Sequence, residues 1–143
     1  MDEIYKKYFD SVPSYLTIQD KDLHLLEANK KFIQDFGEIE GRYCYQVYKN
    51  RSEKCEDCPV ERTFRDGQQH HSEEKIKTRN GNESWVIVNT APIFDNDGKI
   101  VSVMEMSTDI TETKQLQNQF KESQRKFQLL FEEVPCFISI QDK

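Results

Sequence analysis

The chain has 143 residues, of which 36% are hydrophobic and 32% are charged, and its formal net charge at pH 7 is -6. This length suits one domain plus an appendage, because domains cluster at roughly 100–150 residues. Lysines and arginines form no dense basic block, which argues against nucleic-acid binding. No stretch reaches the roughly 18–20 apolar residues of a membrane span, and the first residues are acidic, unlike a signal peptide. We expect a cytoplasmic fragment without direct membrane contact, although its parent could carry a membrane anchor outside this window.

The opening of the chain indicates a helix followed by a β-hairpin. Apolar residues at helical spacing predict an N-terminal amphipathic helix over residues 1–8, with a pattern that continues to Val12. Pro13 stops this pattern because the residue before a proline is pushed out of helical geometry. Leu16 and Ile18 then alternate with polar residues, and the turn at residues 20–22 leads into a partner strand at residues 23–28.

The middle of the chain predicts a helical insert and then three strands. Asn29 is a good N-cap for a short helix that Gly37 ends. Short helices and loops are expected at residues 41–67, and strands at residues 72–78, 84–94 and 99–107. The Asn-Gly and Asp-Gly turns between these strands favour hairpins. The order predicts an α+β fold, a five-stranded antiparallel sheet with helices on one face.

After Ser107 the pattern becomes that of one long helix. Apolar or small residues recur in alternating steps of three and four, the 3.5-residue period of a coiled coil. The seam residues are Thr113, Leu116, Phe120, Ser123, Phe127, Leu130 and Val134. From Thr111 to Glu133 such a helix would be about 35 Å long, more than one small sheet requires. We expect a linker helix at residues 113–134 and a homodimer formed through helical segments.

An internal repeat defines the domain organisation. Residues 9–21 recur as residues 131–143, with seven of thirteen positions identical and an offset of 122 residues. The repeat predicts tandem copies joined by the linker helix. Residues 135–143 would then be the truncated first strand of the second copy, in which Cys136 aligns with Ser14.

The order of these motifs resembles a PAS domain. The resemblance is carried by the turn at residues 20–22, Ala28-Asn29, Gly41, Asn80-Gly81 before Trp85, Asp97-Gly98, and the segment Asp109-Ile110-Thr111-Glu112. It implies one PAS domain at residues 9–112, with a cavity between sheet and helices that senses a small molecule, a cofactor, a redox state or a partner. It also implies a non-catalytic module of a microbial multi-PAS sensor, such as a sensor histidine kinase or diguanylate cyclase, with an output domain in the same chain.

The segment Asp109 to Glu112 is the candidate signal relay. Asp109 lies where its carboxylate could accept hydrogen bonds from the first N–H groups of the long helix. Ile110 would pack on the sheet, and Thr111 and Glu112 would form the first turn. A shift of the sheet would then reach the helix directly. A plain helix cap without a signalling role is the alternative reading of the same residues.

Three cysteines are the most conspicuous chemical motif. Cys55 and Cys58 form a Cys-x-x-Cys pair, and Cys44 precedes them. Such spacing suits a metal ion or an iron–sulfur cluster, with His70 or His71 as a fourth ligand. Structural cysteines, reduced or paired, and a thiol redox switch are the other readings. The sequence does not choose among them.

Aromatic and inner-strand residues are candidates for the wall of the cavity, although a small core would use the same side chains. The candidates are Phe32, Phe36, Tyr43, Tyr45, Trp85, Val88, Thr90 and Met104. No catalytic motif is present in the sequence, which has no phosphate-binding loop, nucleophile elbow or metalloprotease pair. We therefore expect a sensory module that relays a signal through its C-terminal helix. The alternatives are a metal or iron–sulfur redox module and a ligand-free dimerisation domain.

Overall fold

The computed structural model describes residues 2–133. It forms two compact units, one up to Ile110 and one that begins at Thr111. Val134 and residues 135–143, for which the sequence predicts the end of the seam and the truncated second copy, lie outside the described residues.

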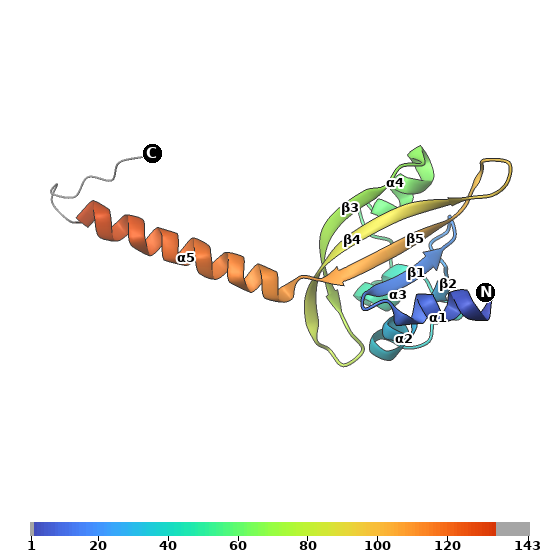
Figure 1. Cartoon of the computed structure of the whole chain (residues 1–143), viewed down its shortest axis with the longest axis horizontal. Helices are drawn as coiled ribbons and strands as arrows, with labels where there is room; N and C mark the ends of the chain where they lie inside the picture. Colours follow the sequence, from blue (N-terminus) through green and yellow to red (C-terminus); the bar gives the residue numbers. More distant parts are fainter. Residues whose placement is uncertain (1, 134–143) are drawn as a thin grey trace. The chain divides into compact units, whose positions relative to one another are not determined.

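The first unit is built on a five-stranded antiparallel sheet (Figure 1). Its strands are β1 (Tyr15–Gln19), β2 (Leu25–Ala28), β3 (His70–Lys77), β4 (Glu83–Phe94) and β5 (Ile100–Asp109), in the spatial order β2-β1-β5-β4-β3. Every neighbouring pair is antiparallel. The sheet therefore agrees with the predicted fold class, and β5 lies at its centre between the β1–β2 hairpin and the β3–β4 hairpin.

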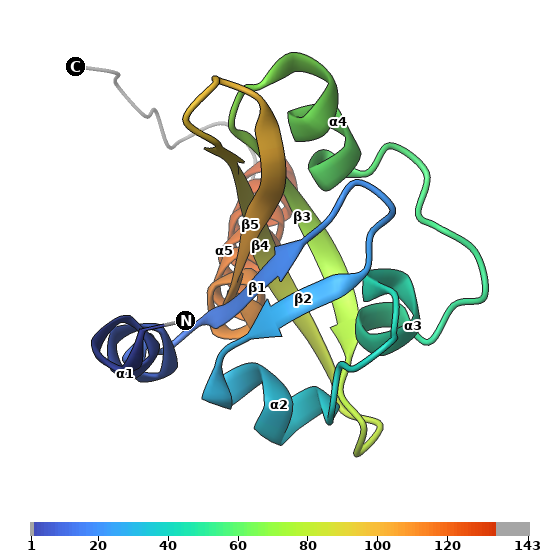
Figure 2. The ribbon, with the colours of Figure 1, turned by 90° about the vertical axis from the view of Figure 1, so that its right-hand side faces the viewer.

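Helices α2 (Lys30–Phe36), α3 (Cys44–Lys49) and α4 (Pro59–Asp66) lie on one face of this sheet, as Figure 2 shows. Asn29 caps α2 as predicted, because its side chain accepts from the backbone N–H of Phe32. The same side-chain oxygen accepts from Leu16 N–H at 3.1 Å, so one residue joins β1 to the start of α2. Gly37 ends α2 with a positive φ of 92°.

The N-terminal helix α1 spans Glu3–Ser11, so it continues past the predicted boundary at residue 8. The extension has a packing reason, because Phe9 is buried while Ile4, Tyr5 and Tyr8 remain more than half exposed. Val12 follows in extended geometry, as expected before Pro13.

The core between sheet and helices is rich in aromatic side chains. Phe32 stacks on Phe36 at a ring-centroid distance of 4.7 Å, and Tyr48 meets both rings edge-on. Phe32, Val60, Val86 and Val103 have no exposed surface. This packing fixes α2, α3 and α4 against the inner face of the sheet and sets the position of the cavity described below.

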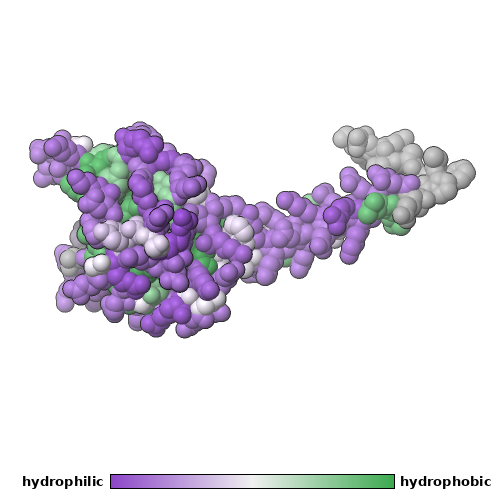
Figure 3. Space-filling model, turned by 180° about the vertical axis from the view of Figure 1, so that it is seen from behind, coloured by the Kyte–Doolittle hydropathy of each residue, from purple (hydrophilic) through white to green (hydrophobic). Residues whose placement is uncertain are grey.

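The second unit contains helix α5 (Thr111–Glu133), which begins two residues before the predicted boundary at 113. Its surface is mainly hydrophilic, with apolar side chains gathered near its C-terminal end in Figure 3. Leu116, Phe120, Phe127 and Leu130, all predicted seam positions, are each more than half exposed in a single chain. Within residues 2–133, no helix is both long enough and apolar enough to cross a membrane.

Candidate functional site

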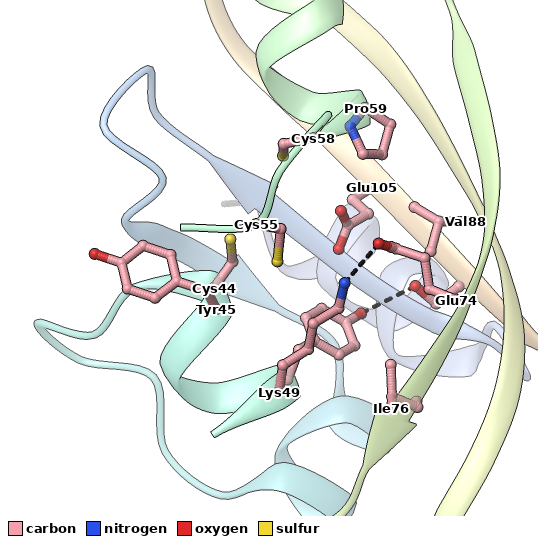
Figure 4. A pocket seen from close by; sticks show the side chains of 12 residues that line it. Cys44, Tyr45, Lys49, Cys55, Cys58, Pro59, Glu74, Ile76, Val88 and Glu105 are labelled. Carbon is pink, nitrogen blue, oxygen red and sulfur yellow. Dashed lines mark hydrogen bonds and ion pairs between the residues drawn. The ribbon is translucent and has the colours of Figure 1, made fainter. Parts of the chain in front are cut away.

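A small cavity lies between the inner face of the sheet, helix α3 and the start of α4 (Figure 4). Its walls combine thiols, charged groups and apolar side chains. The lining residues are Cys44, Tyr45, Tyr48, Lys49, Cys55, Cys58, Pro59, Glu74, Ile76, Val88, Glu105 and Ser107. Their mutual packing leaves only about 30 Å³ of free space. That volume holds one or two water-sized species, whereas organic ligands occupy pockets of roughly 300 Å³ or more.

Glu105 is the most unusual group in the cavity. It lies on β5, the central strand, and its side chain is buried. Burial, together with the charge of Glu74, raises the pKa of its carboxyl group to about 8, although Lys49 and a hydrogen bond from Gln19 act in the opposite direction. Glu105 is therefore largely protonated at neutral pH. A protonated carboxyl can donate a hydrogen bond as well as accept one.

An ion pair lies beside Glu105. Lys49 Nζ is 2.5 Å from Glu74 Oε1, and both side chains are about one-fifth exposed. Although burial lowers the pKa of Lys49, the hydrogen bond to Glu74 and its negative charge raise that pKa above its ordinary value. The cavity therefore has one fixed positive charge. Next to Lys49 on α3, the hydroxyl of Tyr48 donates to Ser107 Oγ on β5 at 3.2 Å.

The three cysteines of the sequence motif come together at the same cavity. Cys44 is the first residue of α3, Cys58 is the N-cap of α4, and Cys55 lies in the loop between these helices. Cys44 and Cys58 are buried and Cys55 is partly exposed, and all three are free thiols. Burial raises the pKa of Cys58 to about 11 and raises that of Cys44 further still. Both buried thiols are therefore protonated at neutral pH.

The structure does not bring the predicted fourth ligand, His70, into this group. His70 lies at the start of β3, where its Nε2 is 2.7 Å from Asp66 Oδ2, and it does not line the cavity. Among the described residues, the metal-ligand atoms that all lie within 4.8 Å of one another belong to Asp20, Asp22 and His24, not to the cysteines. The backbone N–H groups of Asp22 and His24 both donate hydrogen bonds to Asp20 Oδ1, which explains that cluster as a turn.

Two residues predicted for the cavity wall, Trp85 and Met104, lie on the opposite face of the sheet. Val86 and Val88 face inward and are buried, so the residue before Val86 must face outward, and Trp85 is 37% exposed. Met104 pairs with Ala91, whereas Glu105 pairs with the inward-facing Thr90. The prediction for Met104 was therefore displaced by one residue, which reverses the face.

The other predicted wall residues are divided between cavity and core. Tyr45 and Val88 line the cavity. Phe32 and Phe36 lie in the aromatic core. Tyr43 stacks on His24 at 4.3 Å, and the hydroxyl of Thr90 lies 2.6 Å from that of Thr63. None of these last four residues lines the cavity.

Comparison with known proteins agrees with this architecture. A family model described as "PAS fold" matches residues 9–115. The chain belongs to the PAS-fold family. No curated protein matches the sequence.

Solved structures show the same fold at low sequence identity. A chain of VqmA from Vibrio cholerae is 18% identical, with a TM-score of 0.64 over 79% of this chain, which spans 53% of the VqmA chain. An RNA-binding light-oxygen-voltage receptor is 17% identical, with a TM-score of 0.70 over 85% of this chain and 36% of its own. A PAS domain from Colwellia psychrerythraea is 17% identical, with a TM-score of 0.64 over 77% of this chain and 97% of its own.

In this PAS domain the predicted relay segment follows directly from the cavity. Asp109 is the last residue of β5, and the N–H of Ile110 donates to the Trp85 carbonyl at 2.8 Å, which ties the end of the strand to β4. Thr111 and Glu112 form the first turn of α5. Their role in a relay stays a prediction.

Sequence reasoning missed the charged residues of the cavity: Lys49, Glu74 and Glu105. A usable signal was present for Glu105, a single carboxyl group within the apolar run Val103-Met104-Glu105-Met106. A charge in the middle of a strand that is otherwise apolar is rarely buried without a partner or a function.

Proposed function

We propose that this PAS domain is a sensory module that receives its signal in the cavity and relays it through α5 to an output domain, such as a histidine kinase, in the parent protein. One observation carries the proposal. Glu105 and Ser107 form part of the cavity wall, and the strand that contains them continues through Asp109 into α5. A ligand bound against β5 therefore acts only four residues from the end of that strand.

The pattern on α5 supports an output through dimerisation. Leu116, Phe120, Phe127 and Leu130 expose apolar surface at the spacing of a coiled-coil seam. A second copy of the same helix would cover this seam. A change at the cavity would then be transmitted as a change in the pairing of two α5 helices, an element with two arrangements that a ligand can bias.

A ligand-free dimerisation domain is the second candidate, and the small size of the cavity favours it. If the space of about 30 Å³ is only a small void that binds no ligand, the domain would serve to pair protomers. The two candidates differ in one respect. Only the sensory module requires that a change in the cavity alter α5.

Dimerisation is tested by sedimentation of the chain and two matched variants. Leu116→Glu places a charge on the seam, and Asn118→Glu places the same charge on another face of the helix. We expect the wild type and Asn118→Glu to be dimers and Leu116→Glu to shift toward monomer by at least tenfold in dissociation constant. A monomeric wild type would contradict both candidates.

The relay is tested by amide hydrogen exchange over residues 111–133. Val88→Phe enlarges a side chain of the cavity wall on β4, and Asn89→Ser changes the neighbouring exposed position on the outer face. We expect protection of α5 to change in Val88→Phe and not in Asn89→Ser, at unchanged fold by circular dichroism. Unchanged α5 protection in a folded Val88→Phe dimer would leave the ligand-free domain as the function.

A further inference from the structure

Three thiols and one carboxyl group meet at the cavity from separate parts of the fold. Cys44 comes from α3, Cys55 from the following loop, Cys58 from the start of α4 and Glu105 from β5. All four residues line the same cavity, so their side chains border one shared space. Figure 4 shows their side chains gathered around one space.

We propose that Cys44, Cys55, Cys58 and Glu105 bind a single thiophilic divalent cation, such as Zn²⁺. This inference rests on the proposed sensory function, because it identifies the class of ligand that the cavity receives. Three sulfur donors and one carboxylate oxygen are a ligand set for tetrahedral Zn²⁺. The free space of about 30 Å³ admits an ion, but not an organic cofactor.

The surroundings of the site fit the charge of such a centre. Binding replaces the protons of three thiols and of Glu105 by one cation, and the protons leave to solvent. The four deprotonated ligands and Zn²⁺ together carry a formal charge of about −2. Lys49 lines the same cavity as Cys55, so its ammonium group can stabilise a thiolate there while it remains paired with Glu74.

The described conformation is open, and metal binding requires a closure. Among the described residues, no three of the four donor atoms lie within 4.8 Å of one another. A tetrahedral centre with Zn–S bonds near 2.3 Å would hold the sulfurs about 3.8 Å apart. Cys55 can supply the movement, because it lies in a loop without regular structure and is partly exposed. Closure would fasten α3, this loop and α4 to β5.

The experiment is a Co²⁺ titration of the reduced chain under anaerobic conditions, because Co²⁺ reports thiolate ligands by absorption. Cys136→Ser removes the fourth cysteine and installs the residue that the first copy has at that position, Ser14. We expect one Co²⁺ per chain, with sulfur-to-cobalt charge-transfer bands in the near ultraviolet and the intense visible bands of a tetrahedral site. Zn²⁺ should displace Co²⁺ and abolish both sets of bands.

Variants assign the ligands. In the Cys136→Ser background, Cys44→Ser, Cys55→Ser and Cys58→Ser should each weaken Co²⁺ binding by at least about tenfold and reduce the charge-transfer intensity. Glu105→Gln should weaken binding while it keeps the full sulfur intensity. His70→Ala is the matched control and should bind as the wild type does. Cys55→Ser is the thiol variant that should disturb the fold least, because Cys55 is partly exposed whereas Cys44 and Cys58 are buried.

Several results would overturn the proposal: no charge-transfer bands at saturating Co²⁺, bands that persist unchanged in folded Cys55→Ser, loss of binding in His70→Ala, or protein that purifies with iron and acid-labile sulfide. These outcomes are separate from failure of the proposed function. Absence of metal binding with an intact response of α5 to Val88→Phe would reject the cation alone. Metal binding without any change in α5 would reject the relay alone.

Discussion

The protonated state of Glu105 predicts a pH-dependent stability that one substitution should remove. The pKa of this buried carboxyl is about 8 in the folded chain, against an ordinary value of 4.5. The folded state therefore binds more protons than the unfolded state between these values. The stabilisation is fully present below pH 4.5 and is lost as the pH rises toward 8. Glu105→Gln keeps the shape of the neutral acid and cannot ionise.

The magnitude follows from the width of this window. Each pH unit within it changes the free energy of unfolding by about 1.4 kcal/mol. From pH 5 to pH 8 the free energy of unfolding of the wild type should fall by about 3 kcal/mol relative to that of Glu105→Gln. Because Glu105 is almost completely buried, solvent screening reduces this figure little.

The assay is urea unfolding of both proteins at several pH values, in buffer with a chelator so that no cation occupies the cavity. Glu27→Gln removes an exposed carboxylate on β2 and is the control. Its free energy of unfolding should change with pH as that of the wild type does. A constant difference between wild type and Glu105→Gln from pH 5 to pH 8 would refute the reasoning, because it would show that Glu105 ionises alike in both states.

Further predictions concern the framework that positions the cavity, and all are read from urea unfolding. Asn29→Ala should destabilise by about 3 kcal/mol, because it removes a helix cap and leaves buried backbone groups at Leu16 and Phe32 unpaired; a loss below about 1 kcal/mol would contradict this account. Thr63→Val should cost about 1–2 kcal/mol, since it breaks the buried hydroxyl contact with Thr90. Gly81→Ala should cost about 1 kcal/mol at φ 84°, with no effect on the cavity.

The fold was predictable because its signals are local. Asn29, Gly37 and the two hairpin turns act on a few neighbouring residues, and the structure has the expected α2 boundaries and positive φ values at Gly81 and Gly98. The strands therefore begin and end within a few residues of the predicted ranges. The antiparallel pairing of β1 with β2, of β3 with β4 and of β4 with β5 then follows from their short connections.

The cavity was less predictable because it depends on the register between strands, which decides the face on which each side chain lies. Cys44, Cys55 and Cys58 were recognised by spacing alone. Glu105 was not, since its inward direction depends on its pairing with Thr90 across β4 and β5. The same dependence explains why Met104, its neighbour, was assigned to the wrong face. Because side chains alternate between the two faces of a strand, an error of one residue assigns each side chain to the wrong face.

The position of Glu105 also explains how a small event in the cavity could have a large effect. Its neighbours in the cavity come from α3, the loop at Cys55, α4 and β3, so a change of charge there acts on each of these elements at once. β5 pairs with both β1 and β4, and it therefore cannot shift without the rest of the sheet. The end of β5 is tied to β4 by the hydrogen bond from Ile110 to Trp85. Movement of the central strand would then reach Asp109, two residues before α5 begins. The hydrogen-exchange response of α5 is the measurement that decides whether this movement passes into the helix.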